Sequence, residues 1–85
     1  MKGGDYSKAR ISAEIVMAAN VIRDLVRRGP ISAAEAVDVA ETQTGLPHLR
    51  CEMAFITLLN NGEIATDREL MLVPGRAALA SENTP

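Results

Sequence analysis

The stretch that decides the fold covers residues 46–64 and reads LPHLRCEMAFITLLNNGEI. It predicts a helix, because apolar residues recur at helical spacing over most of its circumference. Two neighbouring apolar stripes consist of Leu49, Met53, Ile56 and Leu59, and of Cys51, Phe55 and Leu58. A narrow small or polar strip remains, with Arg50, Ala54, Thr57 and Asn61. We expect this helix to be the best-buried element, with Pro47 in its first turn and a stop at residues 60–62.

A β-hairpin is predicted directly after this helix. Residues 64–66 and 70–73 have the pattern of two short strands, and residues 67–69 form a charged loop between them. Ile64, Leu70 and Leu72 can share one face of the hairpin, because side chains alternate along a strand. Pro74-Gly75 ends the second strand, and residues 76–80 add a helical turn.

Two further helices are predicted ahead of residue 46. The first starts near Ser7, stops at Gly29-Pro30, and buries one face. That face consists of Ile11, Ile15, Ala18, Ile22 and Leu25. The second runs from about residue 33 to residue 43, where Ser32 and Glu35 have the spacing of a capping box at its start. Thr44-Gly45 ends it.

The composition predicts one small domain with an aliphatic core. The chain has 85 residues, of which 47% are hydrophobic but only 2% are aromatic. The expected core consists of Ile15, Ile22, Leu25, Val37, Leu49, Met53, Ile56, Leu59, Ile64 and Leu72. We expect the domain to occupy residues 7–80, between a flexible N-terminus at residues 1–6 and a flexible tail at residues 81–85.

The order of these elements is helix, short stop, helix, glycine turn, helix and hairpin. In this order the chain resembles the winged-helix superfamily over residues 20–80. The resemblance rests on residues 29–32 (GPIS), 44–46 (TGL) and 55–64 (FITLLNNGEI). It implies a mainly α fold, a three-helix winged helix-turn-helix with a short C-terminal β-hairpin wing, in which Pro30-Ile31 adds a strand beside the wing. The alternative is a four-helix bundle in which residues 63–73 form a loop.

Winged helices either bind DNA or hold protein complexes together. The chemistry of the exposed residues must therefore indicate which of the two functions applies. The candidate DNA contacts are His48, Arg50 and Thr57 on the third helix and Arg68 on the wing. Several carboxylates lie near them and would repel phosphate, namely Glu35, Asp38, Glu41, Glu52, Asp67 and Glu69. DNA binding by a transcriptional regulator therefore stands as an alternative, and we expect it to be weak.

A second resemblance favours an adaptor that acts by protein–protein contact. The capping-box helix after residues 27–30 (RRGP) and the run at residues 54–64 resemble the small middle components of prokaryotic ABC-three-component systems. Asn60-Asn61 departs from the apolar residues that this family favours there. The resemblance implies a non-enzymatic winged-helix protein in a defence-associated operon, with an ABC-type ATPase subunit as its partner. A small phage-encoded inhibitor protein is a further alternative of the same size and acidity.

The charge distribution indicates where a partner would bind. Residues 1–28 carry six Lys or Arg against three acids, whereas residues 29–85 carry three against eight. The outer face of the first helix presents Val16, Asn20, Arg23 and Arg27, and Arg23 and Arg27 repel each other at this spacing. We predict that this face binds an acidic surface of a partner protein. The alternative is a solvated helix face.

Residue types for catalysis, metals or cofactors are scarce. The chain has one His and one Cys, no glycine-rich phosphate loop and no Ser, Cys or zinc-protease motif. His48 and Cys51 are close enough on one helix to meet, but a nucleophile also needs an orienting group and a cleft. We therefore expect no enzyme, no metal and no cofactor. The polar start, the single cysteine and the lack of a long apolar run predict a cytoplasmic protein that does not enter a membrane. The sequence leaves open whether it is a monomer or a homodimer.

Overall fold

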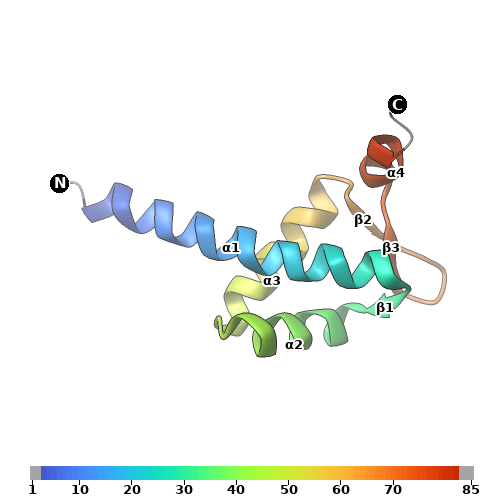
Figure 1. Cartoon of the computed structure of the whole chain (residues 1–85), viewed down its shortest axis with the longest axis horizontal. Coiled ribbons are helices and arrows are strands. Elements are labelled where there is room, and N and C mark those ends of the chain that lie inside the picture. Colours follow the sequence, from blue (N-terminus) through green and yellow to red (C-terminus); the bar gives the residue numbers. More distant parts are fainter. Residues whose placement is uncertain (1–2, 83–85) are drawn as a thin grey trace.

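The protein is mainly helical, with a small antiparallel sheet. The computed structural model describes the backbone of residues 3–82 and the side chains of residues 9–79. The elements are α1 (Gly3–Arg28), β1 (Ile31–Ser32), α2 (Ala33–Thr44), α3 (His48–Asn60), β2 (Ile64–Thr66), β3 (Met71–Pro74) and α4 (Arg76–Glu82). Helices α1, α2 and α3 pack together, and the sheet and α4 lie at one end of them (Figure 1).

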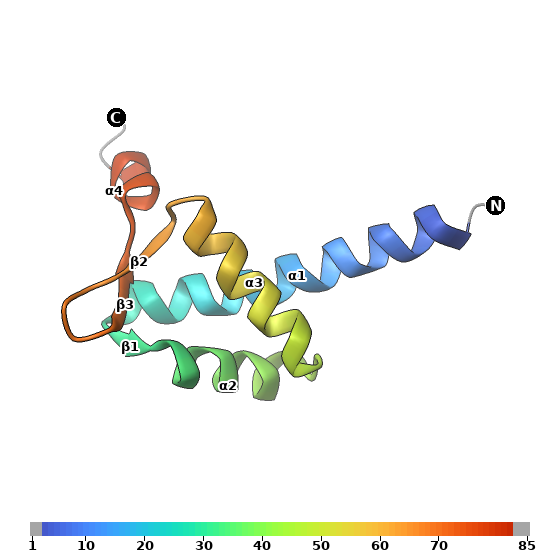
Figure 2. The same ribbon diagram turned by 180° about the vertical axis from the view of Figure 1, so that it is seen from behind.

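Helix α1 is longer than its sequence pattern suggests. It begins at Gly3, four residues before the predicted start, and its N-terminal half extends away from the other elements (Figures 1 and 2). The C-terminal half supplies the core with Ala18, Ala19, Ile22 and Val26. Of the predicted apolar face, Ala18 and Ile22 are buried, whereas Ile15 and Leu25 are only partly buried and pack against the core.

Helix α2 begins and ends as its sequence signals predict. The hydroxyl of Ser32 accepts a hydrogen bond from the Glu35 amide at 3.2 Å, which satisfies a free donor of the first turn. Gly45 has a φ of 72° and donates its amide to the Glu41 carbonyl at 2.8 Å. This left-handed cap is the geometry that glycine adopts without strain, and it turns the chain into α3.

The predicted register of α3 is wrong. Its buried residues are Cys51, Ala54 and Leu58, whereas Leu49 and Ile56 are 59% and 50% exposed. The sequence predicted a buried Leu49 and Ile56 and placed Ala54 in the outward strip. Because α3 is apolar on nearly all sides, periodicity alone cannot choose which side faces inward. The helix instead turns Cys51, Ala54 and Leu58 into the core that it shares with α1 and α2, and two of these three residues are small.

The hairpin is present, and it pairs with a third strand. The sheet order is β1-β3-β2, and both pairings are antiparallel, with Ile31 opposite Leu72 and Ala65 opposite Val73. Strand β1 begins one residue later than the predicted Pro30. The alternative of a four-helix bundle with a loop at residues 63–73 is excluded by these strands.

The turn of the hairpin corrects the strand assignment of Leu70. Ile64 and Leu72 are buried as predicted, but Leu70 is 75% exposed and has a φ of 64°. The carboxylate of Asp67 accepts hydrogen bonds from the amides of Glu69 and Met71, both at 2.9 Å. These bonds extend the turn through Leu70, so β3 starts one residue later than expected.

Gly75 allows the end of β3 to pass close to the end of α3. Its amide donates to the Glu63 carbonyl at 2.9 Å, and a Cβ at this position would lie 2.2 Å from the Gly62 carbonyl oxygen. Helix α4 follows at once and continues to Glu82, beyond the single turn predicted at residues 76–80. Within residues 3–82, no helix combines the length and apolarity that crossing a bilayer requires.

The register of α3 can be tested by truncating one inward and one outward side chain. We expect Leu58→Ala to lower the free energy of unfolding by about 2–5 kcal/mol, because Leu58 is 1% exposed. Ile56→Ala should cost about 1 kcal/mol or less, because Ile56 is half exposed. Urea unfolding measures both free energies. A larger loss of stability in Ile56→Ala than in Leu58→Ala would show that Ile56, and not Leu58, faces the core.

Candidate functional site

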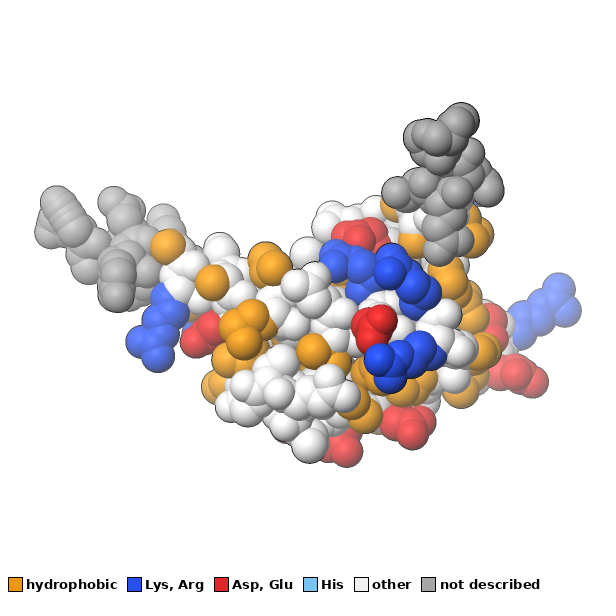
Figure 3. All heavy atoms as spheres, in the orientation of Figure 1, with side chains coloured by type: hydrophobic (Ala, Val, Ile, Leu, Met, Phe, Trp, Pro, Cys, Tyr) orange, Lys and Arg blue, Asp and Glu red, His pale blue; other side chains and the backbone are white. Residues whose placement is uncertain are grey.

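The predicted partner surface lies on one exposed side of α1. We call Val16, Asn20, Arg23 and Arg27 the α1 outer face. Val16 is 56% exposed, and Asn20 and Arg27 are also exposed. Cationic side chains gather over the C-terminal half of α1 (Figure 3). The four residues therefore share one side of the helix, as the sequence spacing predicted.

Arg23 is the exception on this face, because it is held by other residues. Its Nε donates to the Glu63 carboxylate at 2.9 Å, and its Nη1 donates to the Asn20 side-chain oxygen at 2.7 Å. Glu63 thus compensates the charge that was expected to repel Arg27. No sequence pattern reveals this pair, because its members are 40 positions apart. Arg27 makes no ion pair among the described residues, and it is the accessible cation of the face.

A surface hollow of about 410 Å³ adjoins the α1 outer face. It is lined by Arg23, Val26 and Arg27 from α1 and by residues of β2, β3 and α4. Glu63, which pairs with Arg23, also lines the hollow, whereas Arg28 lies outside it and pairs with Asp24 at 2.7 Å. The hollow offers an apolar base beside the free guanidinium of Arg27, an arrangement suited to a partner that carries a carboxylate next to an apolar side chain.

The candidate DNA contacts are not brought together. His48 starts α3, whereas Arg68 lies in the loop between β2 and β3, at the opposite end of the packed helices (Figures 1 and 2). Arg50 is largely covered, and its Nε donates to the Glu14 carboxylate at 3.0 Å. Thr57 is exposed but donates its hydroxyl to the Met53 carbonyl at 2.8 Å. Arg68 is exposed and makes no ion pair among the described residues.

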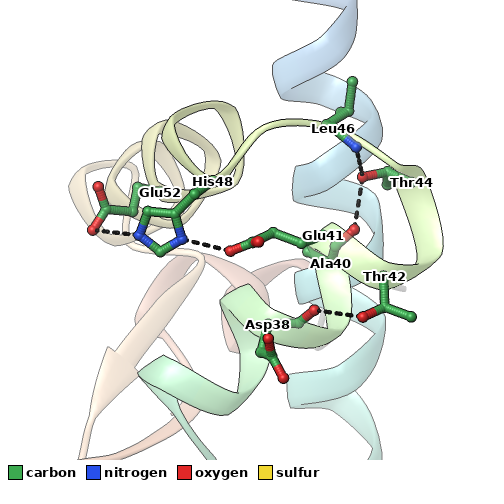
Figure 4. A network of polar contacts seen from close by, with 8 residues as sticks. All are labelled: Asp38, Ala40, Glu41, Thr42, Thr44, Leu46, His48 and Glu52. Atoms are coloured by element: carbon green, nitrogen blue, oxygen red, sulfur yellow. Dashed lines mark hydrogen bonds and ion pairs between the residues drawn. The ribbon is translucent and has the colours of Figure 1, made fainter.

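His48 lies between two carboxylates (Figure 4). Its Nδ1 is 2.5 Å from Glu41 of α2, and its Nε2 is 3.3 Å from Glu52 of α3. The hydrogen bond to Glu41 is the main reason that the pKa of His48 is raised above 6.5, and Glu52 adds to the effect. Both partners are acidic, so this end of α3 does not present a cation to phosphate.

Cys51 and His48 do not form a catalytic pair. The Cys51 thiol is fully buried in the core, while the His48 imidazole points outward to the two carboxylates. Burial raises the pKa of Cys51, which keeps the thiol protonated and weakly nucleophilic. Among the described residues, no three His, Cys, Asp or Glu side chains are placed to hold a metal ion.

The sequence interpretation missed the outward side of α3. We call Leu49, Met53 and Ile56 the α3 outer face, in which Leu49 and Ile56 are at least half exposed and Met53 is half-buried. Their regular spacing was recognised but was assigned to the core. Large apolar residues that cluster on an exposed helix face are typical of a contact surface.

Comparison with known protein families, with curated proteins and with solved structures finds no match for this chain.

The pKa of His48 provides a direct check on this cluster. We expect an NMR titration to give a pKa above 6.5, and we expect Glu41→Gln to lower it more than Glu52→Gln does. Glu35→Gln, an exposed change elsewhere on α2, should leave it unaltered. Since the folded pKa is raised, the contacts of His48 stabilise the fold below pH 6.5 and lose this effect as the pH rises through the folded pKa. An unchanged pKa in Glu41→Gln would contradict the contact.

Proposed function

We propose that this chain is a non-enzymatic winged helix-turn-helix domain that acts as an adaptor through protein–protein contact. The order of the elements and the strand order β1-β3-β2 support this assignment, with α3 in the position of a recognition helix and the β2–β3 hairpin in that of the wing. Fold alone does not choose between DNA and protein, so the choice rests on the surface of α3.

The observation that carries the proposal is the chemistry of α3's exposed side. A helix that enters a DNA groove presents cations and hydrogen-bonding groups to phosphates and base edges. Here the outward side carries Leu49 and Ile56, and the two basic residues of α3 are engaged by carboxylates of the same chain. Such a surface favours an apolar protein contact over a phosphate backbone.

The α1 outer face supplies the second element of the proposal. It combines an exposed Val16 with the accessible charge of Arg27, a pairing of apolar area and arginine that is common at protein interfaces. The family resemblance of the sequence points to an ABC-type ATPase subunit as the partner, in the cytoplasm of a prokaryotic cell. An acidic patch on that partner would meet Arg27.

DNA binding is the second candidate, and one observation favours it. Arg68 lies exposed at the tip of the hairpin, where a wing would touch the DNA backbone, and it makes no ion pair within the described part of the chain. A single such cation supplies one phosphate contact, whereas specific binding uses several.

We expect affinity for a random DNA duplex to be weaker than about 1 µM at ~150 mM salt, as in ordinary non-specific binding. Fluorescence anisotropy with a labelled duplex measures this. Binding tighter than this would support the DNA alternative over the adaptor proposal if it is lost in Arg68→Ala. The matched control Arg76→Ala on α4 should keep that tighter binding.

The α1 outer face can be tested by reversing its accessible charge. Arg27→Glu is preferable to a change at Arg23, because loss of Arg23 would also leave Glu63 without its partner. We expect Arg27→Glu to weaken a partner complex by about tenfold, the scale of an interface arginine.

Arg68→Glu serves as the control, since it reverses one exposed arginine on a different element. Quantitative co-purification of the tagged chain from its own cells compares the two variants with the unaltered chain. If the chain with Arg27→Glu retains its partner as fully as the control does, the α1 outer face is a solvated surface.

A further inference from the structure

A second groove, separate from the α1 outer face, runs between α2 and α3. It has a volume of about 350 Å³ and is lined by Ala33, Ala34, Val37, Asp38, Glu41, His48, Glu52 and Phe55. Its base is apolar, with Val37 and the half-buried ring of Phe55. This volume is at the lower end of about 300–1,000 Å³, the usual range of ligand sites, and suits one or two side chains.

The rim of the groove is acidic. Asp38 and Glu41 lie on α2, and Glu52 lies on α3, so carboxylates come from both of its walls. Glu41 and Glu52 contact the imidazole of His48, and Asp38 adds a third carboxylate to the lining, so the rim stays negative even when His48 is protonated. Asp38 makes no ion pair among the described residues. An anionic ligand such as a nucleic acid is therefore repelled here.

Among residues 9–79, no Lys or Arg lines the groove. Arg23, Arg27 and Arg28 belong to α1, where Arg23 and Arg28 pair with Glu63 and Asp24. The face in Figure 3 carries cationic side chains over α1, whereas α3 lies behind α1 in that view and in front of it when seen from behind (Figure 2). The negative rim is left for a cation from outside the molecule.

We propose that this groove binds a cationic amphipathic segment of a partner protein. A Leu-like side chain of that segment packs on Val37 and Phe55, and a neighbouring Lys or Arg extends its stem across the ring and places its charge among the rim carboxylates. The contact uses area burial, cation–π attraction and charge pairing together. It gives the adaptor a second binding surface, of opposite charge to the α1 outer face, and it does not require that face to be functional.

The probe is a fluorescein-labelled 12-residue peptide of Leu and Lys in equal number. A Ser and Lys peptide of the same charge tests the apolar part, and a Leu and Glu peptide tests the sign of the charge. Amide chemical shifts of the isotopically labelled protein locate the contact, and fluorescence anisotropy gives the affinity. We expect shifts that centre on the residues of the groove, and weaker binding of both control peptides.

The variants are matched in charge. Asp38→Asn with Glu52→Gln removes two carboxylates of the groove, and Glu35→Gln with Glu69→Gln removes two exposed carboxylates outside it. We expect the first pair to weaken peptide binding about fivefold, the effect of losing two exposed ion pairs, and the second pair to leave it unchanged. Amide spectra of both double variants without peptide verify that each is folded.

Three results would overturn the proposal. Equal weakening in both double variants would mean that the peptide responds only to overall charge. If the Ser and Lys peptide binds as tightly as the Leu and Lys peptide, the apolar base of the groove does not contribute to the contact. Concentration-dependent shifts of the groove amides without any peptide would assign the groove to a second copy of the chain. None of these results bears on Arg27→Glu, so the groove and the α1 outer face are judged separately.

Discussion

The close packing of α1 against α3 is the constraint on which the rest of the structure depends. With almost no aromatic side chains, the core is built from small and aliphatic residues that fit only when the helices approach closely. Ala18 of α1 and Cys51 and Ala54 of α3 are fully buried in this core. Because Cys51 and Ala54 face inward, Leu49 and Ile56 on the other side of α3 face outward. The thiol of Cys51 is therefore inaccessible to solvent.

The second consequence of this packing is electrostatic. With α3 set against α1, Arg50 reaches Glu14, and the chain that follows α3 brings Glu63 to Arg23. These pairs compensate the charges of Arg23 and Arg50 and leave Arg27 exposed on one side. On the other side, the carboxylates around His48 outnumber it. The molecule therefore offers surfaces of opposite charge in addition to the apolar exposed side of α3, which carries the adaptor proposal.

The sequence predicted those parts of the fold that depend on local chemistry. The cap at Ser32, the left-handed glycine at Gly45 and the two strands after α3 each follow from residues that are neighbours in the chain. The register of α3 could not be predicted in this way, because a helix that is apolar all round has no preferred inward side until α1 is packed against it. Leu70 was misplaced because the hydrogen bonds of Asp67 lengthen the turn by one residue.

The candidate surfaces were predictable to a smaller extent. The α1 outer face follows from helical spacing, and the structure keeps its four residues on one side. The partners of Arg23 and Arg50 are 40 and 36 positions away, so their neutralisation depends on tertiary packing that the sequence does not display. The groove between α2 and α3 also depends on packing, because its two walls are formed by different helices.

Site-specific photo-crosslinking in the protein's own cells tests the central claim most directly. A photoreactive amino acid in place of Val16 probes the α1 outer face, and the same residue in place of Ile56 probes the exposed side of α3. A third placement, at the exposed Thr42 on α2, is the control for non-specific capture. The account predicts protein adducts from Val16 or Ile56 and none from Thr42. Nucleic-acid adducts from Ile56, without any protein adduct from either exposed position, would contradict it.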